Sequence, residues 1–86
     1  MKQKKLSQKI LTYTAIFEPA DEGGFVVHVP SLPGCHTQGE TFEEAVEMTK
    51  DAIAGYVATL KDINEKIPVE KENMVVTKVS IPYGLI

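Results

Sequence analysis

The sequence predicts an α+β fold of order β-β-β-α-β, an antiparallel sheet with one long helix on a single face. Near the N-terminus, segments 10–18 and 25–29 alternate apolar and polar side chains and are joined by a glycine turn. Alternation with a period of two residues is typical of a strand that is buried on one face. A longer stretch, 42–62, repeats apolar residues every three or four positions, which is the period of an amphipathic helix.

The first two strands are predicted to form a hairpin. One face of the first strand carries its larger apolar side chains, Leu11, Tyr13, Ala15 and Phe17. Asp21 to Gly24 follows as the turn, because glycine adopts positive φ angles without steric cost. The second strand, Phe25 to Val29, is expected to end at Pro30, which has no N–H for the ladder.

A short third strand and the helix come next. Residues 35–38 are predicted as the third strand, after a loop at 31–34. Thr41 and Glu44 have the spacing of a capping box, in which the hydroxyl and the carboxylate each accept a backbone N–H. We expect the helix to continue to about Asp62. Gly55 lies inside this helix, and a close approach to the sheet would explain a residue that weakens helices.

Alternation returns at Met74 to Ile81, which is predicted as the last strand before Pro82. One helix covers only one face of a sheet, so the other face or the edge of the last strand is expected to contact water or another chain. We therefore predict a homodimer or tetramer. The residues expected at this oligomer interface are Ile16, Val26, His28, Val76 and Val79.

Length and composition predict one domain and a cytoplasmic location. The 86 residues divide into a basic tail at 1–9 and a single domain at 10–86, and the 43% hydrophobic content is that of a globular protein. One cysteine cannot form an internal disulfide. Because no apolar run is long enough for a signal peptide or a membrane span, no membrane partner is expected.

Charge is distributed unevenly within the net charge of −3. All nine basic residues are lysine. From residue 10 onward the sequence has twelve acidic residues and five lysines, which gives a formal charge of −7. Such a surface repels nucleic-acid phosphates and attracts a basic protein partner. An acidic surface that serves only solubility is the alternative interpretation.

No group of residues predicts catalysis, a cofactor or a metal. Cys35 and His36 are adjacent, so on a strand their side chains point to opposite faces and cannot form a nucleophile–base pair. One cysteine and two histidines also lack the spacing of a zinc site. The acids available to a two-metal nuclease lie in the turn and on the helix flank, not within 12–17. These acids are Glu18, Asp21, Glu22, Glu43, Glu47 and Asp51.

Several short pieces occur in a specific order between Leu11 and Pro68. They are Tyr13-Thr14-Ala15, Glu22-Gly23-Gly24-Phe25, Val29-Pro30, Leu32-Pro33-Gly34-Cys35, Thr37-Gln38-Gly39 and Thr41-Phe42-Glu43-Glu44-Ala45. In this order the chain resembles the HicB-like antitoxin family. The resemblance implies a partly degraded RNase H-like fold and a partner toxin of the HicA type, an RNA-cleaving protein.

Longer members of that family append a DNA-binding segment, and this chain resembles a short form without it. Residues 76–81 would suit the strand of a ribbon–helix–helix DNA binder. Only five residues follow Ile81, however, so we do not expect this chain alone to bind DNA directly.

The combined hypothesis is a non-enzymatic antitoxin that covers the active surface of a HicA-type toxin. Acids near the hairpin turn and the helix start are predicted to dock that toxin, namely Asp21, Glu22, Glu43 and Glu47. Two alternatives stay open at this point. One is a residual metal-dependent nuclease of RNase H-like fold, and the other is a solitary oligomeric regulatory domain without a toxin.

Overall fold

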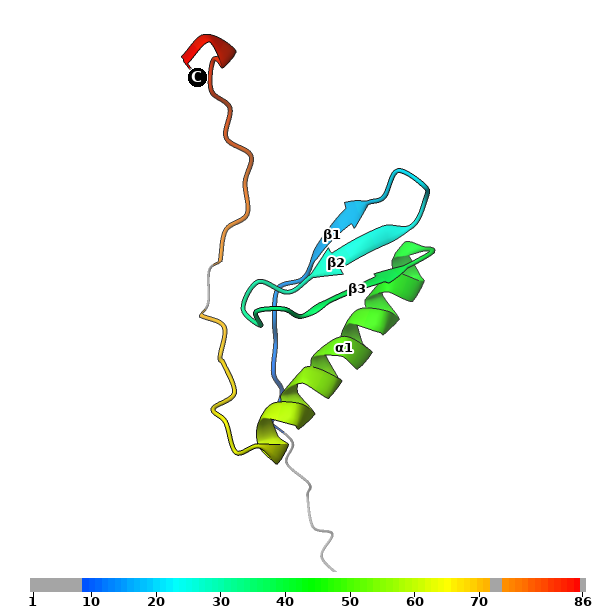
Figure 1. The fold of residues 1–86 in the computed structure, drawn as a ribbon, viewed down its shortest axis with the longest axis vertical. Helices are drawn as coiled ribbons and strands as arrows, with labels where there is room; N and C mark the ends of the chain where they lie inside the picture. Colours follow the sequence, from blue (N-terminus) through cyan, green and yellow to red (C-terminus); the bar gives the residue numbers. More distant parts are fainter. Residues whose placement is uncertain (1–8, 72–73, 86) are drawn as a thin grey trace, which may run out of the picture.

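A three-stranded antiparallel sheet of order β1-β2-β3 is followed by one long helix in the computed structural model, which describes residues 9–71 and 74–85 (Figure 1). The helix packs against β2 and β3 on one face of the sheet. This arrangement confirms the α+β class and the β-β-β-α order. The elements are β1 (Ile16–Pro19), β2 (Phe25–His28), β3 (His36–Gly39), α1 (Phe42–Asp62) and a 3₁₀ turn, η1 (Tyr83–Leu85).

The β1–β2 hairpin forms where the sequence predicts it. Phe17 faces Val27 across the ladder, and the turn closes with a bond from the Ala20 N–H to the Gly24 carbonyl oxygen at 3.0 Å. Gly24 has a φ of +76°, and a Cβ there would lie 2.5 Å from the Gly39 carbonyl oxygen. Glycine is therefore required at this position by both the backbone and the neighbouring strand.

The first strand is shorter than predicted, because β1 begins at Ile16 rather than Ile10. Its register pairs Ile16 with His28, which would bring Thr14 opposite Pro30. Proline has no N–H to offer the ladder. Thr14 instead donates its own N–H to the Glu70 carboxylate at 2.8 Å. The third strand is shifted by one residue from the prediction, to His36–Gly39.

The core lies between the helix and the loop that connects β2 to β3. Val29, Leu32 and Cys35 are buried there. The loop closes on itself through bonds from the Val29 N–H to the Cys35 oxygen and from the Cys35 N–H to the Leu32 oxygen. The side chains packed around this core are Tyr13, Ala15, Ala52, Ile53 and Tyr56. Cys35 is buried, as predicted, and this burial raises the pKa of its thiol.

Both helix ends are closed by side-chain or backbone caps. At the start, the Thr41 hydroxyl accepts the Glu44 N–H at 3.0 Å, as the capping box predicts. The Glu44 carboxylate, however, accepts the N–H of Glu40, one residue before the position expected. At the other end, Asn64 has a φ of +62° and the Glu65 N–H bonds the Leu60 oxygen at 2.8 Å. This is the Schellman pattern of a helix terminus.

The expected close approach of Gly55 to the sheet is wrong. Gly55 is exposed, and a Cβ on it would have no neighbour within 4 Å in the described residues outside its own stretch of the helix. The buried side of α1 carries Ala45 and Thr49. At about 100° per residue, Gly55 lies well away from that side. The sheet therefore does not explain this glycine.

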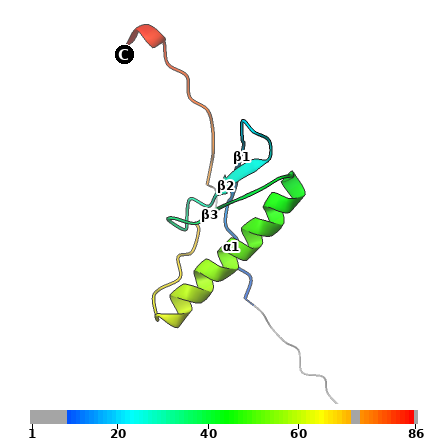
Figure 2. The ribbon, with the colours of Figure 1, turned by 45° about the vertical axis from the view of Figure 1, so that its right-hand side comes forward.

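The predicted last strand is also wrong as an element of a single chain. Residues 74–82 are extended, but none is assigned to a strand and most of their side chains are exposed. Tyr13 and Thr14 hold residues Pro68 and Glu70 beside the start of the sheet, and residues 74–85 then project away from it (Figures 1 and 2). Because a strand needs a neighbouring ladder, alternation alone does not produce one here.

Candidate partner-binding surface

The hairpin turn and the start of α1 lie at the same end of the molecule (Figures 1 and 2). The register brings them together, because Phe25 pairs with Gly39 and the helix begins three residues later at Phe42. We call this end the acidic tip. It carries the exposed acids Asp21, Glu22, Glu40, Glu43, Glu44 and Glu47.

Close backbone contacts fix the geometry of the acidic tip. A Cβ on Gly39 would lie 2.5 Å from the Ala45 nitrogen and 2.6 Å from the Ala45 Cα. On the other side of β3, Gly24 approaches the Gly39 oxygen. The turn, the strand end and the helix start therefore touch through glycine backbone, and their relative positions are set by packing.

Three aromatic rings lie together at the acidic tip. The Phe42 ring centroid is 4.9 Å from that of Phe17 and 5.9 Å from that of Phe25, the second pair being edge-on. Phe42 nevertheless remains 49% exposed. An aromatic side chain that is anchored by two neighbours and still half-exposed offers a pre-organised apolar contact to a partner.

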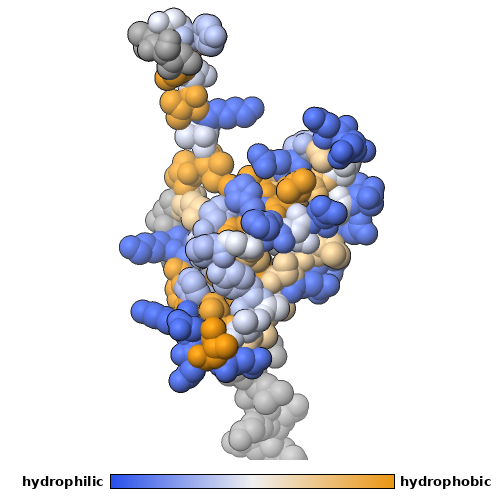
Figure 3. Space-filling model, in the orientation of Figure 1, coloured by the Kyte–Doolittle hydropathy of each residue, from blue (hydrophilic) through white to orange (hydrophobic). Residues whose placement is uncertain are grey.

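A hollow of about 390 Å³ lies between the turn and the helix start. Three carboxylates line it, those of Glu22, Glu40 and Glu44, together with the apolar side chains of Val26 and Met48. Figure 3 shows mainly hydrophilic residues over this end of the molecule. A hollow lined by several carboxylates and a few apolar side chains suits a basic protein partner.

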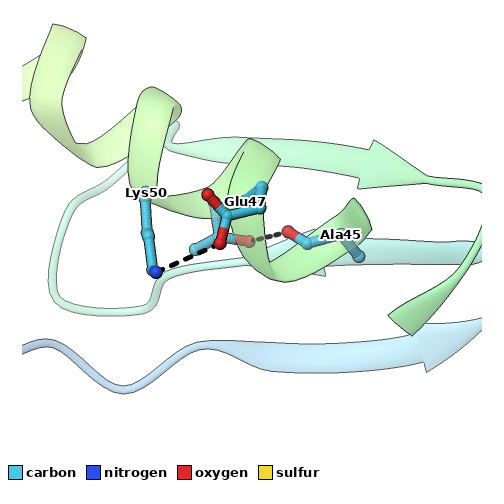
Figure 4. Close-up of polar contacts among 4 residues, drawn as sticks. Ala45, Glu47 and Lys50 are labelled. Carbon is cyan, nitrogen blue, oxygen red and sulfur yellow. Dashed lines mark hydrogen bonds and ion pairs between the residues drawn. The ribbon is translucent and has the colours of Figure 1, made fainter. Parts of the chain in front are cut away.

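The four predicted docking acids divide between two sides of the acidic tip. Asp21 and Glu22 lie in the turn, and Glu22 lines the hollow. Glu43 and Glu47 are exposed on the helix, each two residues from a buried position and so turned away from the sheet. The Glu47 carboxylate also pairs with the Lys50 ammonium at 3.1 Å (Figure 4), which offsets part of its charge.

Glu40 and Glu44 were not among the predicted docking residues. Glu44 was predicted as a member of the capping box; its carboxylate accepts the Glu40 N–H and also lines the hollow. The capping box could have identified Glu44 as a residue of this surface, because the motif places its carboxylate beside the first turn of the helix.

The predicted oligomer residues lie in two different places. Ile16 and His28 are register partners, and with Val26 they occupy the sheet face opposite the helix, as expected. Val26 is 42% exposed. Val76 and Val79 lie on the C-terminal segment and not on this sheet face.

A polar clamp holds the chain that returns from the helix. The Glu70 carboxylate accepts the Thr14 N–H, the Thr14 hydroxyl and, at 3.0 Å, the Ser31 hydroxyl. The bonds from Thr14 lower the pKa of Glu70, because they favour its charged form. Tyr13 donates its hydroxyl to the Pro68 oxygen, and its pKa is raised by burial and by Glu70.

The structure describes residues 9–71 and 74–85. Within these ranges no three His, Cys, Asp or Glu side chains gather in a way that would hold a metal ion. Within the same ranges no helix has the length and apolar character needed to cross a membrane.

Fold and surface together describe a small α+β protein with a surface suited to protein binding. Residues 13–81 match the model of a family described as the HicB-like antitoxin of bacterial toxin–antitoxin systems. The chain belongs to this family.

Relatives of two lengths are similar to the chain. A UPF0150 protein of Thermoplasma acidophilum is 50% identical over 58 residues, 67% of this chain and 84% of the relative. A UPF0150 protein of Synechocystis is 42% identical over 74 residues, 86% of this chain and 91% of the relative. The antitoxin HicB of Escherichia coli is 40% identical over 58 residues, 67% of this chain but only 42% of the relative.

Proposed function

We propose that this protein is a non-enzymatic antitoxin that binds a HicA-type toxin and neutralises it by covering its active surface. Membership of the HicB-like family supports an antitoxin role. The structural observation that carries the proposal is the acidic tip, where Glu22, Glu40 and Glu44 line a hollow together with Val26 and Met48.

Electrostatics favours this partner. A toxin that binds RNA must present cationic side chains to the phosphates of its substrate. An acidic surface attracts such a protein and speeds its association. By occupying the cationic surface, the antitoxin would deny it to RNA without any chemical step.

Binding strength would come from the exposed apolar side chains of the acidic tip. Exposed charges mainly set the association rate, whereas buried aromatic anchors contribute most of the affinity in protein interfaces. Phe42 and Met48, which are 49% and 41% exposed, are the apolar side chains available here. The predicted acids Asp21, Glu22, Glu43 and Glu47 would form the charged rim.

The test measures RNA cleavage by the cognate toxin as the antitoxin is added. Wild-type protein is expected to abolish cleavage at one antitoxin per toxin. Met48→Ala should weaken inhibition several-fold, while Ile63→Ala should not. Ile63 is the matched control, since it is also exposed and apolar but lies at the other end of α1. Full cleavage in the presence of excess wild-type protein would contradict the proposal.

The proposal also covers location, domain organisation, DNA binding and assembly. We place the protein in the cytoplasm as one domain over residues 10–86, with the RNase H-like relationship that the family resemblance implies. Direct DNA binding by this chain is not expected. Residues 1–8 of the predicted basic tail lie outside the described part of the structure. Homodimers or tetramers are proposed, and the C-terminal segment suggests how one would form.

A further inference from the structure

Residues 74–81 have the composition of a strand but no strand partner in their own chain. We call this segment the C-terminal arm. Five of its eight residues are apolar, with Val75 and Val79 exposed by 80% and 83%. No backbone–backbone hydrogen bond joins the arm to any other residue that the structure describes. Its hydrophobic residues extend from the body in Figure 3.

Such a segment differs from an ordinary solvated tail. Solvated tails are rich in charged and small polar residues, whereas the arm has one charge, Lys78, among β-branched side chains. A run of β-forming residues with unpaired N–H and C=O groups is a template for pairing with another chain. The missing partner must therefore be a sheet edge.

The outer edge of β1 is such a site. The sheet order leaves β1 and β3 at the two edges, and α1 packs closely against β3. The free part of this edge runs from Ala15 to Glu18. It lies between the clamp at Thr14 and Pro19, the last residue of β1. Along this edge the N–H and C=O groups of alternate residues point away from β2 and are available for a strand from outside.

We propose that the C-terminal arm of one chain pairs with the outer edge of β1 in a second copy, so that two chains exchange arms reciprocally. Charge supports a second copy as the occupant. The one charged residue of the arm is Lys78 and the one charged residue of β1 is Glu18, an opposite pair across strands. A basic toxin would gain no such attraction from a lysine-bearing arm. Reciprocal exchange also closes the symmetry of a dimer.

Paramagnetic broadening tests which chain the arm pairs with. A nitroxide attached to Val79→Cys in one chain is mixed with wild-type chain labelled with ¹⁵N. Cys35 is not mutated, because it is buried and should not react with the nitroxide reagent. Wild-type protein treated with the same reagent is the control for labelling at Cys35. In an equimolar mixture, the amide signals of Ile16 to Glu18 in the ¹⁵N chain should lose up to half of their intensity, because half of these chains then pair with a labelled arm. A nitroxide on Lys61→Cys, at the far helix end, should leave them unchanged.

Other patterns of broadening would overturn the proposal. In a second sample, one chain carries both the nitroxide and ¹⁵N and is diluted into unlabelled protein. If the signals of Ile16 to Glu18 broaden only in this sample, the arm pairs within its own chain. Broadening confined to β3, or to the arm itself, would show a different interface. Absence of broadening at high micromolar concentration would show that the arm does not pair with a second copy.

Proline substitution gives an independent readout in the full chain. Adjacent N–H groups of an edge strand point alternately toward and away from its partner. Of Val76→Pro and Thr77→Pro, one should therefore raise the dimer dissociation constant roughly tenfold or more and the other much less. Val76→Thr is the control that keeps the N–H. Equal dissociation constants for all four proteins in sedimentation would contradict arm pairing, and toxin inhibition is not involved in either experiment.

Discussion

At the scale of single residues, three glycines of this chain are under different structural constraints. Gly24 has a positive φ and lies against β3, whereas Gly39 has no special φ but touches the backbone of the helix start. Gly55 has neither constraint. Identical residues in the sequence therefore respond differently to the same substitution.

Gly39→Ala is expected to destabilise the fold by about 1–3 kcal/mol, the usual cost of overpacking, because backbone atoms of Ala45 lie where the methyl group would go. Gly55→Ala should instead stabilise it by about 0.5–1 kcal/mol, since alanine is the better helix former. Urea melts of both variants measure this. Equal shifts of the two midpoints would contradict the packing of the acidic tip.

Glu70 is the residue whose ionisation links stability to pH. Its pKa is lowered in the folded protein by the bonds from Thr14. A carboxyl group with a depressed folded pKa contributes stability above its unfolded pKa, and that contribution is lost as pH falls through the folded pKa. The stability difference between wild type and Glu70→Gln should therefore be largest near neutral pH and shrink under acid conditions.

Urea melts from neutral to acid pH measure this difference. Glu65→Gln is the control, because Glu65 is exposed and precedes the clamp. A Glu70→Gln difference that stays constant across the pH range would show that the carboxylate does not hold the returning chain through its charge.

At the scale of elements, local signals located the hairpin and the helix. Gly23-Gly24 marked the turn, and Thr41 with Glu44 marked the helix start. The helix end near Asp62 was predicted correctly. Asn64, whose positive φ terminates the helix, was not used in that prediction. These motifs act within a few residues, so their outcome depends little on the rest of the fold.

Thr41→Ala should cost about 1 kcal/mol of stability, as lost N-caps typically do, because the Glu44 N–H loses its acceptor. Thr41→Asp keeps an acceptor beside the helix N-terminus and should change stability little. Denaturant midpoints of both variants give the answer. An unchanged midpoint for Thr41→Ala would mean that the hydroxyl does not stabilise the helix start.

Elements that depend on distant residues were predicted less well. The length of β1 is set by Pro30 and by Glu70, which lies 56 residues from Thr14. The acidic tip depends on the register that brings Phe25 beside Gly39, and no local motif reports that register. Alternation at 74–81 indicates strand propensity but not which chain supplies the partner.

At the scale of the whole molecule, the arrangement separates two surfaces. The acidic tip lies at one end of the sheet, where the turn meets the helix start, and the arm leaves from the region of the clamp near Thr14 (Figure 1). A toxin at the acidic tip and a second copy on the arm therefore use different residues. Binding and self-association are expected to respond to different mutations.

Association with the toxin is expected to depend on the acids of the hairpin turn. Changing Asp21 and Glu22 together to amides should slow association several-fold at low salt and much less at high salt, because salt screens exposed charges. Dissociation should change little, since single exposed pairs contribute about 0–1 kcal/mol. The matched control is Asp62→Asn with Glu65→Gln, which removes two acids at the far helix end.

The helix pair Glu43 and Glu47 should have a smaller effect than the turn pair. Lys50 offsets part of the Glu47 charge, and both helix acids point away from the sheet. Stopped-flow mixing of each double variant with the toxin ranks the three pairs. If the turn pair slows association no more than the far control at low salt, the acids of the tip do not guide the toxin, and its docking must rest on apolar contacts such as those of Phe42 and Met48.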